Sequence, residues 1–412
     1  MLDVVAKYAK KWRFELNPKK SEVVVFGHKP APRNIVWKLG DSKIRQVIQY
    51  KYLGIELTRT LNYSNYIKRR TGKARRNMIQ TLAMGIRGGF MTTRLANIMW
   101  MSLVRSIIEY GSEVWGEQPV PEFDKLQAQM GKRILRCGSR TSGEVVRGEL
   151  GWERQIARRD EMRLRYWARL VRMQDDRIAK QVYRASKARL EREQGEGEQE
   201  ATDTWCTYTK KIMFELDLQH EWYTENIPGE EDWNDLIRER IHEREQGEWR
   251  RSCLSKPKLR TYCVLKQRLR TEPYLRTRHR GGIPELAKLR GGTNRLRIEQ
   301  GRYTKEEVEE RVCMCCESKE VEDEKHFMLR CTLYNDLRES MWEKYEEITG
   351  EKREECKDSD EQINALIGDR HQPDEKEDSD KQNWKTQRYE LLVKVIIKYV
   401  TTAMNRRRGH LE

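Results

Sequence analysis

The sequence predicts a mainly α-helical protein with one small β unit near its N-terminal end. Short apolar segments, separated by turn residues, lie between Trp12 and Leu57. Apolar residues after Thr60 recur mostly at helical spacing. Cysteines cluster between Cys313 and Cys331, as in small modules that bind a metal ion. We therefore expect a β unit, a long helical body and a small metal-binding module, in this order.

A helix is predicted over Leu2–Phe14, where apolar residues recur on one face. The polar turn that starts at Asn17 leads into an apolar strand at Val23–Phe26, which Pro30 and Pro32 end. Two further strand segments are expected, with a Gly40-Asp41 turn between them: Ile35–Trp37 and Lys51–Leu57.

The helical body is expected to start at Tyr63 and to contain a strongly basic first helix. Thr92-Thr93 can cap the second helix, whose wide apolar face indicates a core position. Residues 138–151 are rich in turn formers, and we expect no helix there. The predicted helices are Tyr63–Ile86, Arg94–Tyr110, Glu122–Cys137 and Arg154–Gln174, the last continuing to Gln194.

The second half begins after a low-complexity hinge, Glu191–Glu200. Helices with scattered tryptophans are expected over residues 203–250, and a basic stretch follows Pro257. The acidic stretch Lys352–Lys381 is predicted to be a flexible loop. Helices are expected at Cys331–Glu347 and Trp384–Met404.

Positive charge is concentrated in two parts of the 412-residue chain, whose net charge is +16. Residues 1–190 hold about 40 Lys and Arg against about 17 Asp and Glu, and Lys256–Arg302 holds about 14 against about 3. Such surfaces favour a polyanionic partner, most simply nucleic acid. The alternative is the solvated face of long helices. Because Trp and Tyr alternate with the basic residues, we favour nucleic acid.

Cysteine usage and the lack of apolar runs indicate the compartment. Only four of the nine cysteines are clustered, which does not suggest a disulfide framework. The start has no secretory signal pattern, and no run of 18 apolar residues exists, so we expect no membrane partner. The prediction is an intracellular protein of the nucleus and cytoplasm. Protein partners are not indicated.

The spacing Cys313-x2-Cys316-x9-His326-x4-Cys331 predicts a four-ligand zinc site. Four protein ligands leave no open position, so the zinc would be structural. Cys315 is an alternative ligand to Cys313 or Cys316, and chance clustering is the alternative to a site. A Cys-His nucleophile pair is a weaker interpretation, because no orienting group is evident nearby.

Residues that would perform catalysis are not evident. The sequence has no glycine-rich phosphate loop and no paired aspartates on a strand or hairpin. Asp175-Asp176 is expected within a charged helix. The residues alone therefore indicate a basic, helical, zinc-containing protein that binds nucleic acid.

Several short motifs follow one another along the chain, beginning with Tyr8-Ala-Lys-Lys-Trp12, Leu16-Asn-Pro-Lys-Lys-Ser21 and Tyr50-Lys-Tyr-Leu-Gly54. These three resemble the end of the palm in the reverse transcriptases of non-LTR (LINE-type) retrotransposons. The stretch from Arg105 to Trp115 and the later Glu149-Leu-Gly151 resemble the thumb of the same family. Lys288–Arg302, followed by Glu322–Phe327 with Cys331 and Tyr334, resembles the segment that leads into the C-terminal zinc knuckle and the knuckle itself.

The resemblance implies a C-terminal part of such an RNA-directed DNA polymerase, with an incomplete palm. Lys20 matches the motif lysine, and Tyr52, Leu53 and Gly54 match the primer grip, which the family builds as a hairpin. The metal-binding aspartates lie in motifs upstream of these residues, so magnesium is expected only with the missing palm half, and this chain alone is expected to be inactive. The implied parts are a palm remnant (1–58), thumb and connector (59–194), linker (195–302), zinc knuckle (303–345) and a C-terminal region (346–412).

The expected partners are RNA and DNA, as a template–primer duplex. The residues predicted to contact them are Lys68, Arg69, Arg70, Lys73, Arg75, Arg76, Lys288, Arg290, Arg295, Arg297 and Arg302. The alternatives are a domesticated zinc-containing RNA- or DNA-binding protein without a polymerase role, and a non-functional remnant. An incomplete palm would also leave an exposed apolar face, or poor order, at the N-terminal end.

Overall fold

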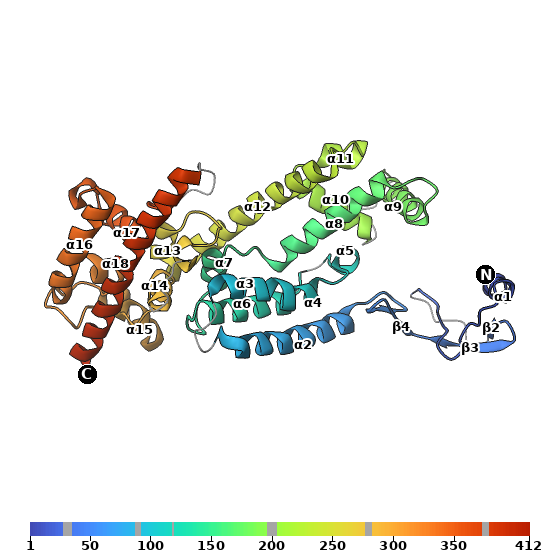
Figure 1. The fold of residues 1–412 in the computed structure, drawn as a ribbon, viewed down its shortest axis with the longest axis horizontal. Helices are drawn as coiled ribbons and strands as arrows, with labels where there is room; N and C mark the ends of the chain where they lie inside the picture. The colour runs from blue at the N-terminus through green and yellow to red at the C-terminus, as the bar shows by residue number, and fades with distance from the viewer. Residues whose placement is uncertain (28–34, 87–91, 118, 196–203, 277–281, 373–378) are drawn as a thin grey trace.

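The computed structural model describes residues 1–27, 35–86, 92–117, 119–195, 204–276, 282–372 and 379–412. The prediction of a mostly helical protein with a small sheet unit is confirmed. Figure 1 shows an elongated molecule, with the β unit at one end and a helical C-terminal unit at the other. None of the helices in the described ranges is both long and apolar enough to cross a membrane.

The N-terminal unit combines one helix with five short strands. Strand β1 pairs in parallel with β3, and β2 pairs with β3 in antiparallel fashion across the predicted Gly40-Asp41 turn. Strands β4 and β5 form a separate hairpin. The bounds are α1 (Leu2–Lys11), β1 (Glu22–Val24), β2 (Trp37–Leu39), β3 (Ser42–Val47), β4 (Gln49–Tyr52) and β5 (Ile55–Thr58).

Two details of the predicted strands are wrong. Strand β3 was not predicted, because only Ile44 in its charged sequence is buried. The single strand predicted over Lys51–Leu57 is instead a hairpin, whose turn residues Leu53 and Gly54 have φ of 46° and 88°. Two consecutive positive φ values are typical of the tight turns that match the strand twist.

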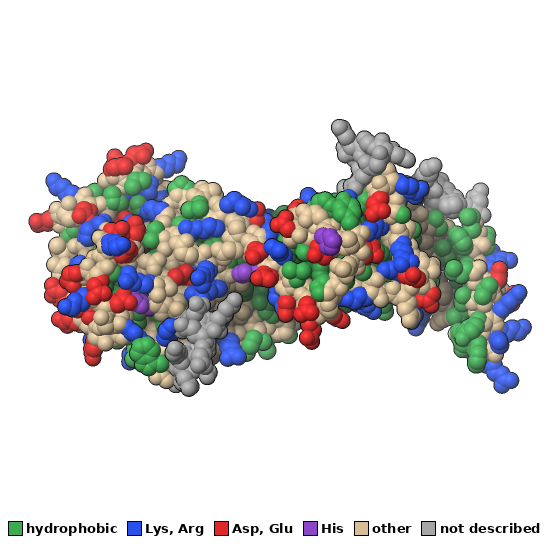
Figure 2. Space-filling view, turned by 90° about the horizontal axis from the view of Figure 1, so that it is seen from above, with side chains coloured by type: hydrophobic (Ala, Val, Ile, Leu, Met, Phe, Trp, Pro, Cys, Tyr) green, Lys and Arg blue, Asp and Glu red, His purple; other side chains and the backbone are tan. Residues whose placement is uncertain are grey.

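The apolar face expected at the N-terminal end is exposed in part: Phe26 is 52% exposed, whereas Val23, Val24, Val25 and Ile55 are half-buried. Other apolar side chains of this end are more exposed. Val4 is 67% exposed, Trp12 61% and Ile48 76%. Figure 2 shows hydrophobic side chains beside Lys and Arg at this end of the molecule.

The middle of the chain is a helical layer built around stacked Trp100 and Trp152, whose ring centroids lie 5.4 Å apart. The Thr92 hydroxyl accepts a hydrogen bond from the amide of Leu95, so the predicted cap is confirmed. The helices of this layer are α2 (Ser64–Thr81), α3 (Thr93–Met99), α4 (Ser106–Glu109), α5 (Ser112–Trp115), α6 (Pro121–Ile134), α7 (Gly143–Leu150) and α8 (Gln155–Arg172). Two π-helical segments, Leu82–Ile86 and Trp100–Arg105, interrupt it.

Three predictions for this layer are wrong. The turn-rich stretch 138–151 contains α7, because Ser142 caps its first turn and Gly151 ends it in the left-handed region. The long helix predicted from Arg154 to Gln194 is broken at Met173–Arg177 into α8 and α9. Asp175-Asp176 therefore lies in a turn rather than in a helix.

A second core of buried tryptophans, including Trp167, Trp222 and Trp233, lies between α8 and the next helices. These helices are α9 (Ile178–Gly195), α10 (Trp205–Glu215), α11 (Gln219–Thr224) and α12 (Glu230–Leu254). Figure 1 shows α12 running from this core to the C-terminal unit. Part of the predicted hinge, residues 196–200, lies outside the described residues.

The C-terminal unit is organised around α18, which packs on α14 and α16. The predicted flexible loop at Lys352–Lys381 is wrong for its first half, which contains α17, capped by Asp358 and anchored by buried Ile363 and Leu366. The helices here are α13 (Arg260–Leu265), α14 (Ile283–Arg290), α15 (Arg297–Thr304), α16 (Asn335–Thr349), α17 (Ser359–Ile367) and α18 (Ser379–Leu411). Short 3-10 turns join them at Pro257–Leu259, Pro273–Arg276, Val308–Glu310, Thr332–Tyr334 and Arg353–Glu355.

A fully buried set of charges joins the middle layer to the C-terminal unit. Arg290 lies 3.3 Å from Glu149 and 3.0 Å from Glu272, and Lys266 pairs with Glu272. The Tyr274 hydroxyl donates to Glu149 at 2.6 Å. Two carboxylates thus face two cations, which compensates charges that would be very costly to bury alone. We call these five residues the Glu149 network.

Gly151 allows the end of α7 to approach the backbone at Thr271 closely. It has φ of +64°, and a Cβ atom there would lie 2.4 Å from the backbone nitrogen of Thr271. The neighbouring backbone is paired, because the amide of Glu272 donates to the carbonyl of Glu149 at 2.9 Å. A side chain at position 151 would therefore push the backbone at Gly151 away from the backbone at Thr271.

Gly151→Ala is therefore expected to lower the free energy of unfolding by about 3 kcal/mol or more, from the left-handed backbone and the steric clash together. The matched control is Gly350→Ala, because Gly350 has φ of +69° but nothing within 4 Å of an added Cβ. The control should cost only about 1 kcal/mol. Urea unfolding followed by circular dichroism measures both, and equal losses would contradict the close approach at Gly151.

Candidate nucleic-acid interface and metal centre

The turn of the β4–β5 hairpin rests against the end of α4. The Tyr110 hydroxyl donates to the carbonyl of Leu53 at 2.5 Å, and the ring lies beside Gly54, where an added Cβ would be 3.5 Å from it. Ile55 fills the space next to Gly111, which has φ of +71°. The hairpin therefore contacts the helical layer through the Tyr110 ring beside Gly54 and through Ile55, which packs closely on Gly111.

Tyr52, Leu53 and Gly54 are exposed along one side of this junction. Between hairpin and helices lies an open cavity of about 540 Å³. Its lining includes Tyr52, Leu53, Ile55, Leu57, Ser106, Glu109, Tyr110, Gly111, Glu113, Arg158 and Met162. Burial raises the pKa of Glu109, although Arg105 and Arg158 beside it act in the opposite direction.

Two arginines at the start of α2 fasten this helix to the hairpin and to Tyr110. Arg69 pairs with Glu56 of β5. The Arg70 guanidinium lies 4.5 Å from the centroid of the Tyr110 ring, and its Nε donates to the Tyr66 hydroxyl at 2.8 Å. Tyr66 in turn donates to the carbonyl of Tyr110 at 3.0 Å, and burial raises the pKa of its phenol. Arg69 and Arg70 thus have partners within the protein.

The other basic residues of α2 point outward. The buried positions of the helix include Ala74 and Met78, which lie on the opposite side. Helix α2 contains no Asp or Glu, and its outward basic residues form no hydrogen bond or ion pair with any described residue. We call these residues the α2 basic face: Lys68, Lys73, Arg75 and Arg76.

The predicted basic residues between Lys288 and Arg302 differ in the structure, since some have partners within the protein and others are exposed. Arg290 is only 2% exposed and belongs to the Glu149 network, so its predicted contact with nucleic acid is not supported. Lys288 pairs with Glu285, and Arg297 pairs with Glu306.

The remaining predicted residues are exposed. Arg295 and Arg302 lie on the surface of the C-terminal unit. Lys20 lies in a turn before β1, where its backbone amide donates to the Asn17 side chain at 3.2 Å.

The cysteine cluster brings together the four predicted ligand atoms, all within 4.8 Å of one another. Cys313 Sγ lies 3.9 Å from Cys331 Sγ, and Cys316 Sγ lies 3.4 Å from His326 Nε2. Tetrahedral zinc with bonds of about 2.3 Å to sulfur and 2.0 Å to nitrogen separates sulfurs by about 3.8 Å and sulfur from nitrogen by about 3.5 Å. The cluster therefore could hold a metal ion, and its donor set and spacing fit zinc.

Backbone geometry explains why His326 and Cys331 come together although they are five positions apart in the sequence. The two residues bracket a π-helical turn, in which the amide of Cys331 donates to the carbonyl of His326 at 2.8 Å. Residues five apart thus lie one turn apart and present their side chains to one point. On the other side, the amide of Cys313 donates to the carbonyl of Glu320 at 2.8 Å, which closes the loop that carries Cys316.

The surroundings of the cluster also suit a metal. His326 Nδ1 lies 2.9 Å from Glu320 Oε2, so a carboxylate orients the ring and leaves Nε2 for the ion. Hydrogen bonds from the Cys315 and Cys331 thiols lower the pKa of the Cys313 thiol, which favours the thiolate that binds zinc.

Cys315 belongs to a second possible set, with Cys313 and Glu322. However, Glu322 accepts two hydrogen bonds from Arg407, at 2.6 and 2.7 Å. A metal ion held by Glu322 would have to compete with this buried pair. The first set, with Cys316, His326 and Cys331, is therefore the better candidate.

A comparison with known proteins agrees with a relation to reverse transcriptases. The chain is 26% identical over 164 residues to a probable RNA-directed DNA polymerase from transposon BS of Drosophila melanogaster. The match covers 38% of this chain and 18% of that protein, so the chain spans less than a fifth of its relative. No family model and no solved structure matches the chain. The similarity supports a reverse-transcriptase-related protein.

Sequence reasoning missed the residues that dock the hairpin. Tyr110 and Gly111 lie within a motif noted for its resemblance to the thumb, but their contacts with Leu53 and Ile55 are more than 50 positions away in sequence. In the sequence, Gly111 indicated only the end of a helix. Nothing local indicated that Arg70 would stack on Tyr110.

Zinc is expected at about one ion per chain, and Cys316→Ser should lower this content sharply, because three ligands bind zinc much more weakly than four. Cys315→Ser is the matched control, because Cys315 directly precedes Cys316 in the same loop and its replacement should leave the zinc content unchanged. Metal analysis of the purified proteins by mass spectrometry measures both. Zinc loss in the control alone would assign the ion to Cys313, Cys315 and Glu322.

Proposed function

We propose that this chain is the C-terminal part of a non-LTR retrotransposon RNA-directed DNA polymerase, and that it grips the template–primer duplex. In this proposal residues 1–58 end the palm, 59–194 form the thumb and connector, and 195–302 form the linker. Residues 303–345 form a knuckle with structural zinc, and 346–412 complete the C-terminal unit. The coarse relation rests on the polymerase similarity. The assignment of these parts to residue ranges, and their roles in binding the duplex, are our inference.

The observation that carries the proposal is the α2 basic face. Its four cations lie within nine residues, a rise of about 12 Å at 1.5 Å per residue, beside an exposed hairpin turn. Cations without carboxylate partners keep their charge available for phosphates. RNA–DNA hybrids are recognised mainly through shape and backbone, which suits a basic face of this kind.

The proposed roles follow from these positions. The exposed turn of Tyr52, Leu53 and Gly54 would support the end of the primer, and Tyr110 would hold the turn in place from below. Lys20, in its Asx turn, would approach the leaving pyrophosphate only beside a complete palm. Magnesium would be held by aspartates outside this chain, where it would stabilise the charge that develops during nucleotide transfer. The chain itself would bind and orient the duplex.

Replacing the α2 basic face by glutamine (Lys68, Lys73, Arg75 and Arg76) should weaken binding to an RNA–DNA hybrid. Each lost phosphate contact lowers the slope of log K against log salt by about 0.7–0.9, so the slope should fall by about 3. Fluorescence anisotropy of a labelled hybrid over a range of salt concentrations measures this change.

The matched control replaces four exposed basic residues elsewhere by glutamine: Arg177, Lys211, Lys394 and Lys398. The net charge changes equally in both variants. If both slopes fell by the same amount, binding would depend on overall charge rather than on α2. A flat salt response of the wild-type chain would remove the proposed function.

The purified chain should not extend a primer on an RNA template, because we propose that the aspartates that hold the metal ions lie outside it. Primer extension in the presence of magnesium and deoxynucleotides tests this, with a commercial reverse transcriptase as the positive control. Measurable DNA synthesis would show that the chain contains its own catalytic centre.

A further inference from the structure

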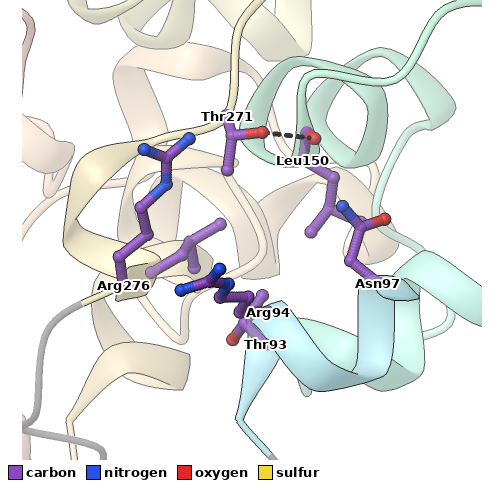
Figure 3. Close-up of a pocket in the computed structure, with 7 residues that line it drawn as sticks. Thr93, Arg94, Asn97, Leu150, Thr271 and Arg276 are labelled. Atoms are coloured by element: carbon purple, nitrogen blue, oxygen red, sulfur yellow. Dashed lines mark hydrogen bonds between the residues drawn. The ribbon is translucent and has the colours of Figure 1, made fainter. Parts of the chain in front are cut away.

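A pocket of about 380 Å³ lies where the N-terminal end of α3 meets the C-terminal end of α7 and the 3-10 turn Pro273–Arg276. Its lining is drawn in Figure 3 and consists of Thr93, Arg94, Asn97, Leu150, Thr271, Leu275 and Arg276. We propose that this pocket binds a phosphate group of the nucleic-acid backbone. The inference rests on the proposed function and adds a specific anchoring point to it.

The charge of the pocket is positive only. Two guanidinium groups, Arg94 and Arg276, lie on one side of it, and no carboxylate lines it among the described residues. Arg94 forms no hydrogen bond or ion pair with any described residue. The exposed, unpaired guanidinium of Arg94 therefore leaves a positive charge at the pocket that a bound anion would compensate. Guanidinium forks bind phosphate oxygens in pairs, which makes phosphate the natural anion.

Asn97 lies opposite the two arginines, and its amide NH₂ group faces the pocket, where it can donate to an anion. The Trp152 indole donates to Asn97 Oδ1 at 2.8 Å. An indole N–H can only donate, so the oxygen must face Trp152 and the NH₂ group must face the pocket. Figure 3 shows this nitrogen on the pocket side. Trp152 is buried and stacks on Trp100, so the orientation of the amide is fixed.

The rest of the lining suits the sugar that carries the phosphate. Leu150 and Leu275 are buried side chains that give the pocket an apolar wall. The Thr271 hydroxyl donates to the carbonyl of Leu150 at 2.9 Å, which fixes the wall beside the Glu149 network. The volume lies near the lower end of the range of about 300–1,000 Å³ for ligand pockets. A phosphate with its sugar matches both the charge and the size.

The position of the pocket agrees with a strand that continues beyond the α2 basic face. In Figure 1 the end of α2 and the start of α3 lie on the side of the thumb nearest the C-terminal unit. The pocket is formed by α3 and α7 on the thumb side and by the 3-10 turn on the other. A backbone held here would bridge the proposed thumb and the segment that leads to the zinc knuckle.

Two variants test the pocket by the salt dependence of binding to a labelled RNA–DNA hybrid. Arg94→Gln should lower the slope of log K against log salt by about 0.7–0.9. Asn97→Asp keeps an oxygen for Trp152 but places a negative charge in the pocket, so the affinity should fall about tenfold or more. Arg408→Gln, an exposed arginine in α18, is the matched control for the lost charge.

The outcomes separate the pocket from the proposed function. If the wild-type slope is steep and Arg94→Gln equals Arg408→Gln, the pocket is not a backbone site, although the proposed function stands. A second outcome would also overturn the inference. Inorganic phosphate would raise the melting temperature of the wild type but not of Arg94→Gln, and the two proteins would bind the hybrid equally. The pocket would then bind a free anion rather than the nucleic-acid backbone. Because Arg94 is exposed, its variant should fold even if Asn97→Asp does not.

Discussion

The structure depends on the requirement that every charge in the Glu149 network stays paired. Its members come from α7, from α14 and from the segment between them, and four of them are ionisable groups with almost no exposure to water. Removing one partner of such a set leaves an uncompensated buried charge, which costs about 3–5 kcal/mol. The network therefore links the helical layer to the C-terminal unit through ion pairs between α7, α14 and the segment between them. The proposed phosphate pocket at Arg94 lies beside this junction, because Leu150 and Thr271, which line it, are neighbours of Glu149 and Glu272 in the sequence.

The parts of the fold that could be predicted are those with a strong local signal. The candidate metal ligands could be predicted because the spacing of Cys313, Cys316, His326 and Cys331 is itself the signal. The π-helical turn explains how His326 and Cys331, five positions apart, come together. The second helix of the layer, α3, and its cap at Thr92 followed from periodicity and capping preference. By contrast, β3 has one buried side chain, and α7 lies in a stretch dominated by turn formers, so tertiary contacts decided both.

The arginines show why the candidate sites could be predicted only in part. In sequence, Arg70 and Arg76 lie in the same basic helix, and Arg290 lies in a basic block like Arg295. In the structure, Arg70 stacks on Tyr110 and Arg290 is fully enclosed by carboxylates, while Arg76 and Arg295 face outward. The difference depends on partners that are distant in sequence, such as Glu149, 141 positions from Arg290. Composition can therefore indicate a basic protein, but it cannot show which Lys and Arg side chains lack a partner within the protein and remain free to bind phosphates.

The hairpin contact at Tyr110 has a consequence for motion. Among the described residues, the turn is held by the hydrogen bond from Tyr110 to Leu53, the Arg69–Glu56 pair and the contacts of Gly54 with Tyr110 and of Ile55 with Gly111. The turn residues themselves are exposed. Few buried contacts and exposed hydrogen bonds are typical of regions that open at low free-energy cost. The N-terminal unit should therefore swing about this contact while the helical layer stays rigid. In amide hydrogen exchange, β4 and β5 would lose their protection well before α6 and α8.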